Sequence, residues 1–100
     1  MGQLYTSGDW HVKQGREDDF LAAWEELALW TRENVPNTTW AALLKDDDDP
    51  GRFRSFGPWE TREDVAAWRA MPEFKDAVAR MRDMLESFEA HIFEAVVEVG

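Results

Sequence analysis

The first third of the chain changes from a strand-like to a helix-like spacing of apolar residues. From Leu4 to Lys13, apolar and polar positions alternate loosely with the two-residue period of a strand, and Gln14-Gly15 interrupts them. From Glu17 to about Asn34, apolar residues recur every three or four positions, which is typical of a helix that buries one face. Val35-Pro36-Asn37 predicts the end of this helix.

A hairpin and a second helical region follow. Segments 39–45 and 52–60 are predicted strands, and the aspartate run 46–49 with Pro50 and Gly51 is the turn between them. Thr61-Arg62-Glu63-Asp64 has the form of a capping box and predicts the start of a helix. Pro72 divides this region and opens a second helical segment that runs to about Ser87. Segment 91–99 alternates again and predicts a last strand.

The predicted order of elements, β-α-β-β-α-β, indicates a particular α+β fold. In the ferredoxin-like arrangement of this order, both helices cover one face of an antiparallel sheet. Several strands also place apolar residues on the other face of the sheet, which therefore needs a cover. A second copy packed sheet to sheet would supply it, and two-fold homodimers are the commonest soluble oligomers. We therefore expect a homodimer that forms through the sheet face.

Composition adds a high aromatic content to a short chain. One hundred residues are enough for a single domain, residues 1–100, with a modest core. Six Trp and six Phe are many for such a core, since each buried ring removes about 150–250 Å² from water. We expect some of these rings to line a cavity for a small apolar or aromatic ligand, or to lie at a subunit interface.

Charge and residue usage exclude several classes of function. A formal net charge of −10 opposes nucleic acid and anionic membranes as partners. The absence of an 18-residue apolar run and of secretion-signal features predicts a cytoplasmic protein. There is no Cys for a disulfide or a thiolate site, and the two His lack the spacing of a metal site. An EF-hand loop starting at Asp46 fails, because Pro50 and Gly57 occupy ligand positions. We expect no metal and no cofactor.

Two stretches resemble the antibiotic biosynthesis monooxygenase family of the dimeric α+β barrel superfamily. They are GDWHVKQGREDDFLAAW near the start and RFRSFGPWETREDVAAWRAMPEFKDAV in the middle. The second stretch combines a Trp at the end of the third strand, a capped helix with an inner Trp, and a Pro-x-Phe that opens the next helix. The resemblance covers nearly the whole chain and implies a dimeric α+β barrel. It also implies oxygenation of aromatic, quinol or polyketide-like substrates with O₂ and without metal or flavin.

Residues carry over from this resemblance one position at a time. Heme-degrading relatives use an Asn in the first strand, a Trp after the third strand and a His on the last helix. Here the Trp is Trp59, but Gly8 and Val78 stand near the other two positions, which disfavours heme binding or degradation. Oxygenases of the antibiotic type use an Asn four residues before the Trp, where this chain has Ser55. Trp59 is thus the one unambiguous match.

These comparisons give a short set of candidate site residues. Trp59 would shape a pocket between sheet and helices, with Phe20, Trp24, Phe56 and Trp68 as possible walls. Ser55 and one of Tyr5, Asp9 or His11 would supply polar contacts or accept a substrate proton. The alternative interpretation for each of these residues is a structural role, in core packing, at the surface or at an interface. The alternative to a monooxygenase is a non-catalytic dimer that binds a small ligand in the same pocket.

Overall fold

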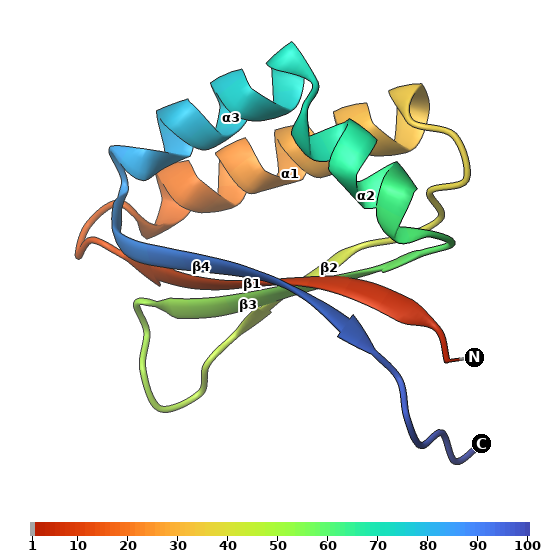
Figure 1. Cartoon of the computed structure of the whole chain (residues 1–100). Helices are drawn as coiled ribbons and strands as arrows, with labels where there is room; N and C mark the ends of the chain where they lie inside the picture. The colour runs from red at the N-terminus through yellow and green to blue at the C-terminus, as the bar shows by residue number, and fades with distance from the viewer. Residues whose placement is uncertain (1) are drawn as a thin grey trace.

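The computed structural model describes residues 2–100 as one antiparallel sheet with helices on one of its faces (Figure 1). The elements are β1 (Leu4–Val12), α1 (Glu17–Asn34), β2 (Ala42–Lys45), β3 (Arg52–Trp59), α2 (Arg62–Arg69), α3 (Pro72–Arg82) and β4 (Leu85–Glu94). The strand order is β2-β3-β1-β4, and every pair is antiparallel. This is the predicted α+β, ferredoxin-like fold, with its second helical region divided into α2 and α3.

The helix boundaries follow from local signals in the sequence. The Thr61 hydroxyl accepts a hydrogen bond from the amide of Asp64 at 3.0 Å, so the predicted cap of α2 is confirmed. Met71 is extended before Pro72, which is the first residue of α3, because proline excludes the helical region for the residue before it. Helix α1 ends at Asn34 as predicted, with Val35 in an extended conformation. No helix in residues 2–100 is long and apolar enough to cross a membrane.

The predicted boundaries of the last helix and the last strand were wrong. The last helix ends at Arg82 and not near Ser87, and β4 spans Leu85–Glu94 in place of the predicted 91–99. The chain turns at Met84, whose amide donates to the Met81 carbonyl and whose carbonyl accepts from the Lys13 amide, both at 2.9 Å. Leu85 stands four residues after Met81, so the helical spacing continues across a turn that no Gly or Pro marks.

Strand β2 is shorter than the prediction of 39–45 and begins at Ala42. The residues before it form a loop over the end of the sheet. The Thr38 hydroxyl anchors this loop by donating to the Val35 carbonyl at 2.8 Å, and Asn37 adopts a left-handed conformation with φ of 67°. The four aspartates form a turn as predicted, because an Asp46 carboxylate oxygen accepts the amides of Asp48 and Asp49.

The core lies between the sheet and helices α1 and α3. Phe20 of α1 and Met81 of α3 are fully buried there, and the ring of Phe20 lies 5.2 Å from Trp10 and 5.5 Å from Phe53. A second, smaller cluster lies under α2. Its buried members are Val35, Trp59 and Val65. The wide apolar space between the two clusters is where a cavity remains.

The opposite face of the sheet carries no helix (Figure 1). Strand alternation and register place on this outer face Tyr5, Ser7, Asp9, His11, Ala42, Leu44, Arg52, Arg54, Phe56, Pro58, Glu89, His91 and Phe93. Leu44 and Phe93 expose about half of their surface. The outer face is therefore a mixture of exposed apolar side chains and charged groups.

Candidate functional site

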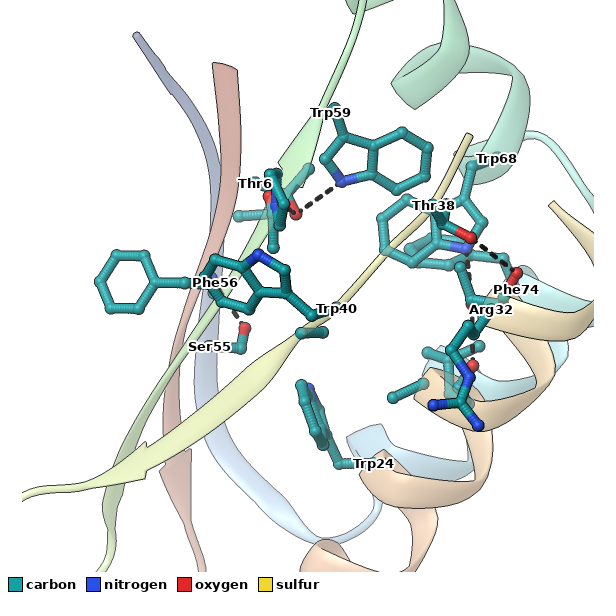
Figure 2. A pocket seen from close by; sticks show the side chains of 18 of the residues that line it. Thr6, Trp24, Arg32, Thr38, Trp40, Ser55, Phe56, Trp59, Trp68 and Phe74 are labelled. Atoms are coloured by element: carbon teal, nitrogen blue, oxygen red, sulfur yellow. Dashed lines mark hydrogen bonds between the residues drawn. The ribbon is translucent and has the colours of Figure 1, made fainter. Parts of the chain in front are cut away.

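A cavity of about 320 Å³ opens between the inner face of the sheet, helices α1 to α3 and the loop before β2. This volume is in the range of small-molecule sites. Five of the six tryptophans border it: Trp10, Trp24, Trp40, Trp59 and Trp68. Figure 2 shows strand residues such as Thr6 and Ser55 on one side and α1 and α2 residues on the other. The cavity is thus walled mainly by aromatic rings.

Three of these indoles have their N–H groups bonded to hydroxyls in the wall. Trp59 donates to Thr6 at 3.0 Å (Figure 2). Trp10 donates to Ser55 and Trp68 donates to Thr31, also at 3.0 Å. These rings therefore present carbon atoms and π-faces to the cavity, because their single donors are already in use. Trp59 and Trp68 also pack against each other with ring centroids 4.9 Å apart. Their positions are fixed before any ligand enters.

Ser55 is a polar group of the wall that can still donate a hydrogen bond. Its Oγ accepts two hydrogen bonds, from the Trp10 indole and from the Gly8 amide, both at 3.0 Å. Two accepted bonds fill the lone pairs of a hydroxyl and leave its O–H to donate. Ser55 can therefore donate a hydrogen bond to a ligand oxygen, but it is poorly placed to accept a proton.

Gly8 makes this arrangement possible. A Cβ atom at Gly8 would lie 2.5 Å from the Trp10 indole nitrogen and 2.8 Å from the Ser55 Oγ. Such distances are well inside van der Waals contact, so any larger residue would push the indole and the hydroxyl apart. Gly8, which stands near the position of the Asn of heme-degrading relatives, therefore makes room for a Trp10–Ser55 hydrogen bond.

Charged groups are few in the wall. The charged residues that border the cavity are Glu25 and Arg32 of α1 and Arg69 of α2. Arg69 is partly buried, and this burial lowers the pKa of its guanidinium from the usual value. Its one hydrogen bond is a long contact of 3.5 Å to the His91 carbonyl. Neither arginine pairs with a carboxylate of residues 2–100.

The structure brings together four of the residues proposed from the sequence. Trp59, Ser55, Trp24 and Trp68 all border the cavity. Phe56 borders it as well, but Figure 2 shows its ring pointing away on the other side of the strand. Phe20 does not line it. Phe20 is fully buried in the core, because it sits in the first turn of α1, beneath Trp10 and Phe53.

Tyr5, Asp9 and His11 lie apart from the cavity, on the outer face of the sheet. Asp9 accepts two hydrogen bonds from the Arg52 guanidinium at 3.2 Å and also lies near Arg54 and His11. The hydrogen bonds from Arg52 hold the pKa of the Asp9 carboxyl below its usual range, and the nearby positive charges add to this effect. Strand alternation explains the placement, since these odd-numbered residues face away from Thr6, Gly8 and Trp10.

The cavity has little that could ligate a metal or heme. Within residues 2–100, no three His, Asp or Glu side chains are grouped to hold a metal ion. His11 and His91 are both on the outer face, and Val78, near the helix position where heme-degrading relatives carry a histidine, is buried in the core. The donor set of the wall consists of hydroxyls, guanidiniums and one carboxylate.

Sequence reasoning missed several residues of the cavity. Trp40 borders it from the loop before β2, but the apolar run around it suggested a strand. Arg32 and Arg69 were missed because each stands in the last turn of a helix, where a basic residue is common in any protein. Thr6 and Thr31 could have been found from their positions on the same faces as Trp10 and Leu27.

Comparison with known proteins identifies relatives of the chain. The profile of the family described as "Antibiotic biosynthesis monooxygenase" matches residues 6–80. No curated protein matches the chain at a significant level. Among solved structures, SnoaB from Streptomyces nogalater, a cofactor-independent oxygenase solved as a mutant, is 16% identical with a TM-score of 0.88. The alignment covers 99% of this chain and 98% of SnoaB.

Two further structures are similar along almost their whole length. A protein from Nitrosomonas europaea, provisionally described as an antibiotic biosynthesis monooxygenase, is 22% identical with a TM-score of 0.84, over 100% of this chain and 97% of its own. A Caulobacter crescentus protein with the same provisional description is 16% identical with a TM-score of 0.86, over 96% and 92%. At these identities, the structures establish a shared fold.

Proposed function

Because the chain belongs to the antibiotic biosynthesis monooxygenase family, we propose that it is a monooxygenase that oxidises a small aromatic, quinol or polyketide-like substrate with O₂ and without a cofactor. The observation that carries the proposal is the cavity, whose wall contains five tryptophans and the Ser55 hydroxyl, which is free to donate. Flat aromatic ligands match such a wall, since rings stack or tilt against each other favourably.

The proposed reaction needs no external electron donor. A phenol or enol loses a proton, and the resulting anion passes one electron to O₂. Recombination forms a C–O bond to the ring carbon and gives a hydroperoxide. When that carbon carries a second hydrogen, as in an anthrone, loss of water leaves a carbonyl. One oxygen atom ends in the product and the other in water, and the substrate supplies all the electrons.

The wall residues have distinct roles in this proposal. Trp59 and Trp68 hold the ring system of the substrate between their own rings. Hydrogen bonds from their N–H groups to Thr6 and Thr31 keep the two indoles in position. The Ser55 hydroxyl donates to the substrate oxygen on which negative charge develops, which lowers the cost of ionisation. Glu25 is the one carboxylate that borders the cavity within residues 2–100, and it is exposed, so it can pass the substrate proton to solvent.

We also propose that the protein is a homodimer through the outer face of the sheet. The support is physical: Leu44 and Phe93 are about half exposed there, and Phe56 adds a third apolar side chain to the same face. The C-terminal segment beyond β4 contributes Val96, Val97 and Val99, which are 87%, 80% and 93% exposed. Such apolar exposure on a small protein is typical of a surface that is covered in the assembly.

Oxygen uptake tests the proposed reaction. The wild type is measured with a panel of anthrones and hydroquinones in the presence of a chelator, beside a Trp59→Phe variant. We expect uptake with at least one member of the panel and a loss of roughly tenfold to a hundredfold in kcat/KM for the variant, because a smaller ring lets the substrate shift from its reactive position. Trp30→Phe is the matched control, since Trp30 is the tryptophan outside the cavity wall.

The outcomes separate the two candidate functions. Uptake that falls with Trp59→Phe and persists with Trp30→Phe supports the oxygenase. Tight binding of panel members, seen as quenching of tryptophan fluorescence, without any oxygen uptake would refute catalysis and leave a small-ligand-binding protein. Equal loss in both variants would contradict a specific role for Trp59.

A further inference from the structure

The charge around the cavity differs from the charge of the molecule as a whole. The chain has a formal net charge of −10, but the charged residues of the wall are one glutamate and two arginines, a local balance of −1 + 2 = +1. A protein with this overall charge repels anions from most of its surface. Positive charge concentrated at an apolar cavity therefore requires a specific explanation.

Arg69 is the more informative of the two arginines. It is partly buried in the same wall as Trp59 and Trp68, and no carboxylate of residues 2–100 pairs with it. Partial burial of a cation without a counter-charge has a cost, and the one contact at 3.5 Å to the His91 carbonyl offsets little of it. Four of its five N–H groups remain available to a ligand.

Arg32 adds a second cation from another element. It stands in the last turn of α1, and Figure 2 shows its side chain on the helix side of the cavity, across from Thr6 and Ser55 on the strands. Arg32 forms no ion pair with a carboxylate of residues 2–100, and the ion pair of Glu26 in α1 is with Arg80. Both arginines also stand in the last turn of a helix, where a positive charge interacts favourably with the helix dipole. That interaction does not require the side chain to border the cavity.

We propose that the cavity selects aromatic ligands that carry a fixed negative charge, such as a carboxylate, and that Arg69 and Arg32 bind this charge. The inference rests on the proposed function, because it specifies the substrate class of the same cavity. The aromatic wall would hold the ring system, the Ser55 hydroxyl would face its reacting oxygen, and the guanidiniums would bind the acidic end. Guanidinium groups suit this task, because their planar N–H pairs match the two oxygens of a carboxylate.

A pair of probes of equal shape tests the proposal. 2-Naphthoate and 2-naphthamide differ in charge but hardly in size, and their affinities are measured by calorimetry for the wild type, Arg69→Gln, Arg32→Gln and the double variant. We expect the wild type to prefer naphthoate, and the double variant to lose about tenfold to a hundredfold of its naphthoate affinity with little change for naphthamide. Raising the salt concentration should weaken naphthoate binding alone.

Arg82→Gln is the matched control. Arg82 is an exposed arginine in the last turn of α3 that lies outside the cavity wall. Its replacement by Gln changes the net charge by the same amount as Arg69→Gln or Arg32→Gln alone. A naphthoate preference that survives in the double variant, or that falls equally with Arg82→Gln, would overturn the proposal. Equal wild-type affinities for both probes would overturn it while the aromatic cavity stands. Binding of neither probe would count against the proposed function as well.

Discussion

At the scale of single residues, three indoles of the cavity wall are each paired with one hydroxyl. The partners of Trp59, Trp10 and Trp68 are Thr6, Ser55 and Thr31, which come from β1, β3 and α1. The sequence identified Trp59 and Ser55 as candidates, but the Trp10–Ser55 bond joins residues 45 positions apart. Such a pairing depends on strand register, which periodicity alone does not determine. Tyr5, Asp9 and His11 do not reach the cavity for a different reason, since strand alternation turns them away from Thr6 and Trp10.

The Asp9 cluster on the outer face predicts a pH dependence of stability. The pKa of Asp9 is lowered in the folded protein, chiefly by hydrogen bonds from Arg52, relative to the unfolded value near 3.8. The carboxylate therefore stabilises the fold above about pH 3.8, and this contribution is lost as the pH falls below that value through the lower folded pKa. We expect Asp9→Asn to reduce the change in unfolding free energy between pH 6 and pH 3, measured by urea denaturation.

Asp47→Asn provides the comparison, since Asp47 is exposed and forms no ion pair within residues 2–100. It should retain the wild-type acid dependence. An Asp9→Asn protein whose stability falls with acid as steeply as that of the wild type would contradict the stabilising role of the Asp9 carboxylate beside Arg52.

At the scale of elements, boundaries with a chemical signal were predictable and the others were not. The cap at Thr61 and the break at Pro72 fix the first residues of α2 and α3 within one position. The end of α3 carries no such signal, because the helical spacing of apolar residues continues from Met81 to Leu85. Tertiary contact decides there, since the Met84 carbonyl is held by the Lys13 amide next to β1. The early start of β4 is a consequence of that contact.

The α2 cap can be tested by stability. Thr61→Ala removes the acceptor of the Asp64 amide, and we expect it to lower the free energy of unfolding by about 1 kcal/mol in urea denaturation. Thr39→Ala serves as the control, because Thr39 is exposed and its hydroxyl makes no hydrogen bond within residues 2–100. Equal effects of the two substitutions would show that the cap contributes nothing specific. Because α2 carries Trp68 and Arg69, its stability also bears on the cavity.

At the scale of the whole molecule, the fold leaves one side of the sheet uncovered, and this predicts the oligomeric state. Light scattering should give twice the chain mass of 11.6 kDa for the wild type. We expect Leu44→Glu or Phe93→Glu to shift the protein toward the single-chain mass, because each would place a charge in the proposed interface. Leu21→Glu, at an exposed leucine of α1, should leave the dimer intact. A wild type at 11.6 kDa would contradict the proposed dimer.

The fold was predictable at this scale because β-strand alternation, helix caps and element order agree with one another. The activity was less accessible, because the cavity forms from residues of six different elements and one loop. Trp40 and Arg69 border the cavity only because the folded chain places the loop before β2 and the end of α2 beside the sheet. Composition still gave a useful signal, since the excess of aromatic rings predicted a cavity or an interface lined by them, and five tryptophans border the cavity.

The central claim is that this cavity oxidises an aromatic substrate with O₂ alone, and isotope labelling tests it most directly. The chelator-treated protein is incubated under ¹⁸O₂ with a substrate that gives oxygen uptake, and the product is analysed by mass spectrometry. The proposed reaction predicts one ¹⁸O atom in the product carbonyl and the other in water. A product whose new oxygen comes from unlabelled water, or the absence of any product across the panel, would contradict the account.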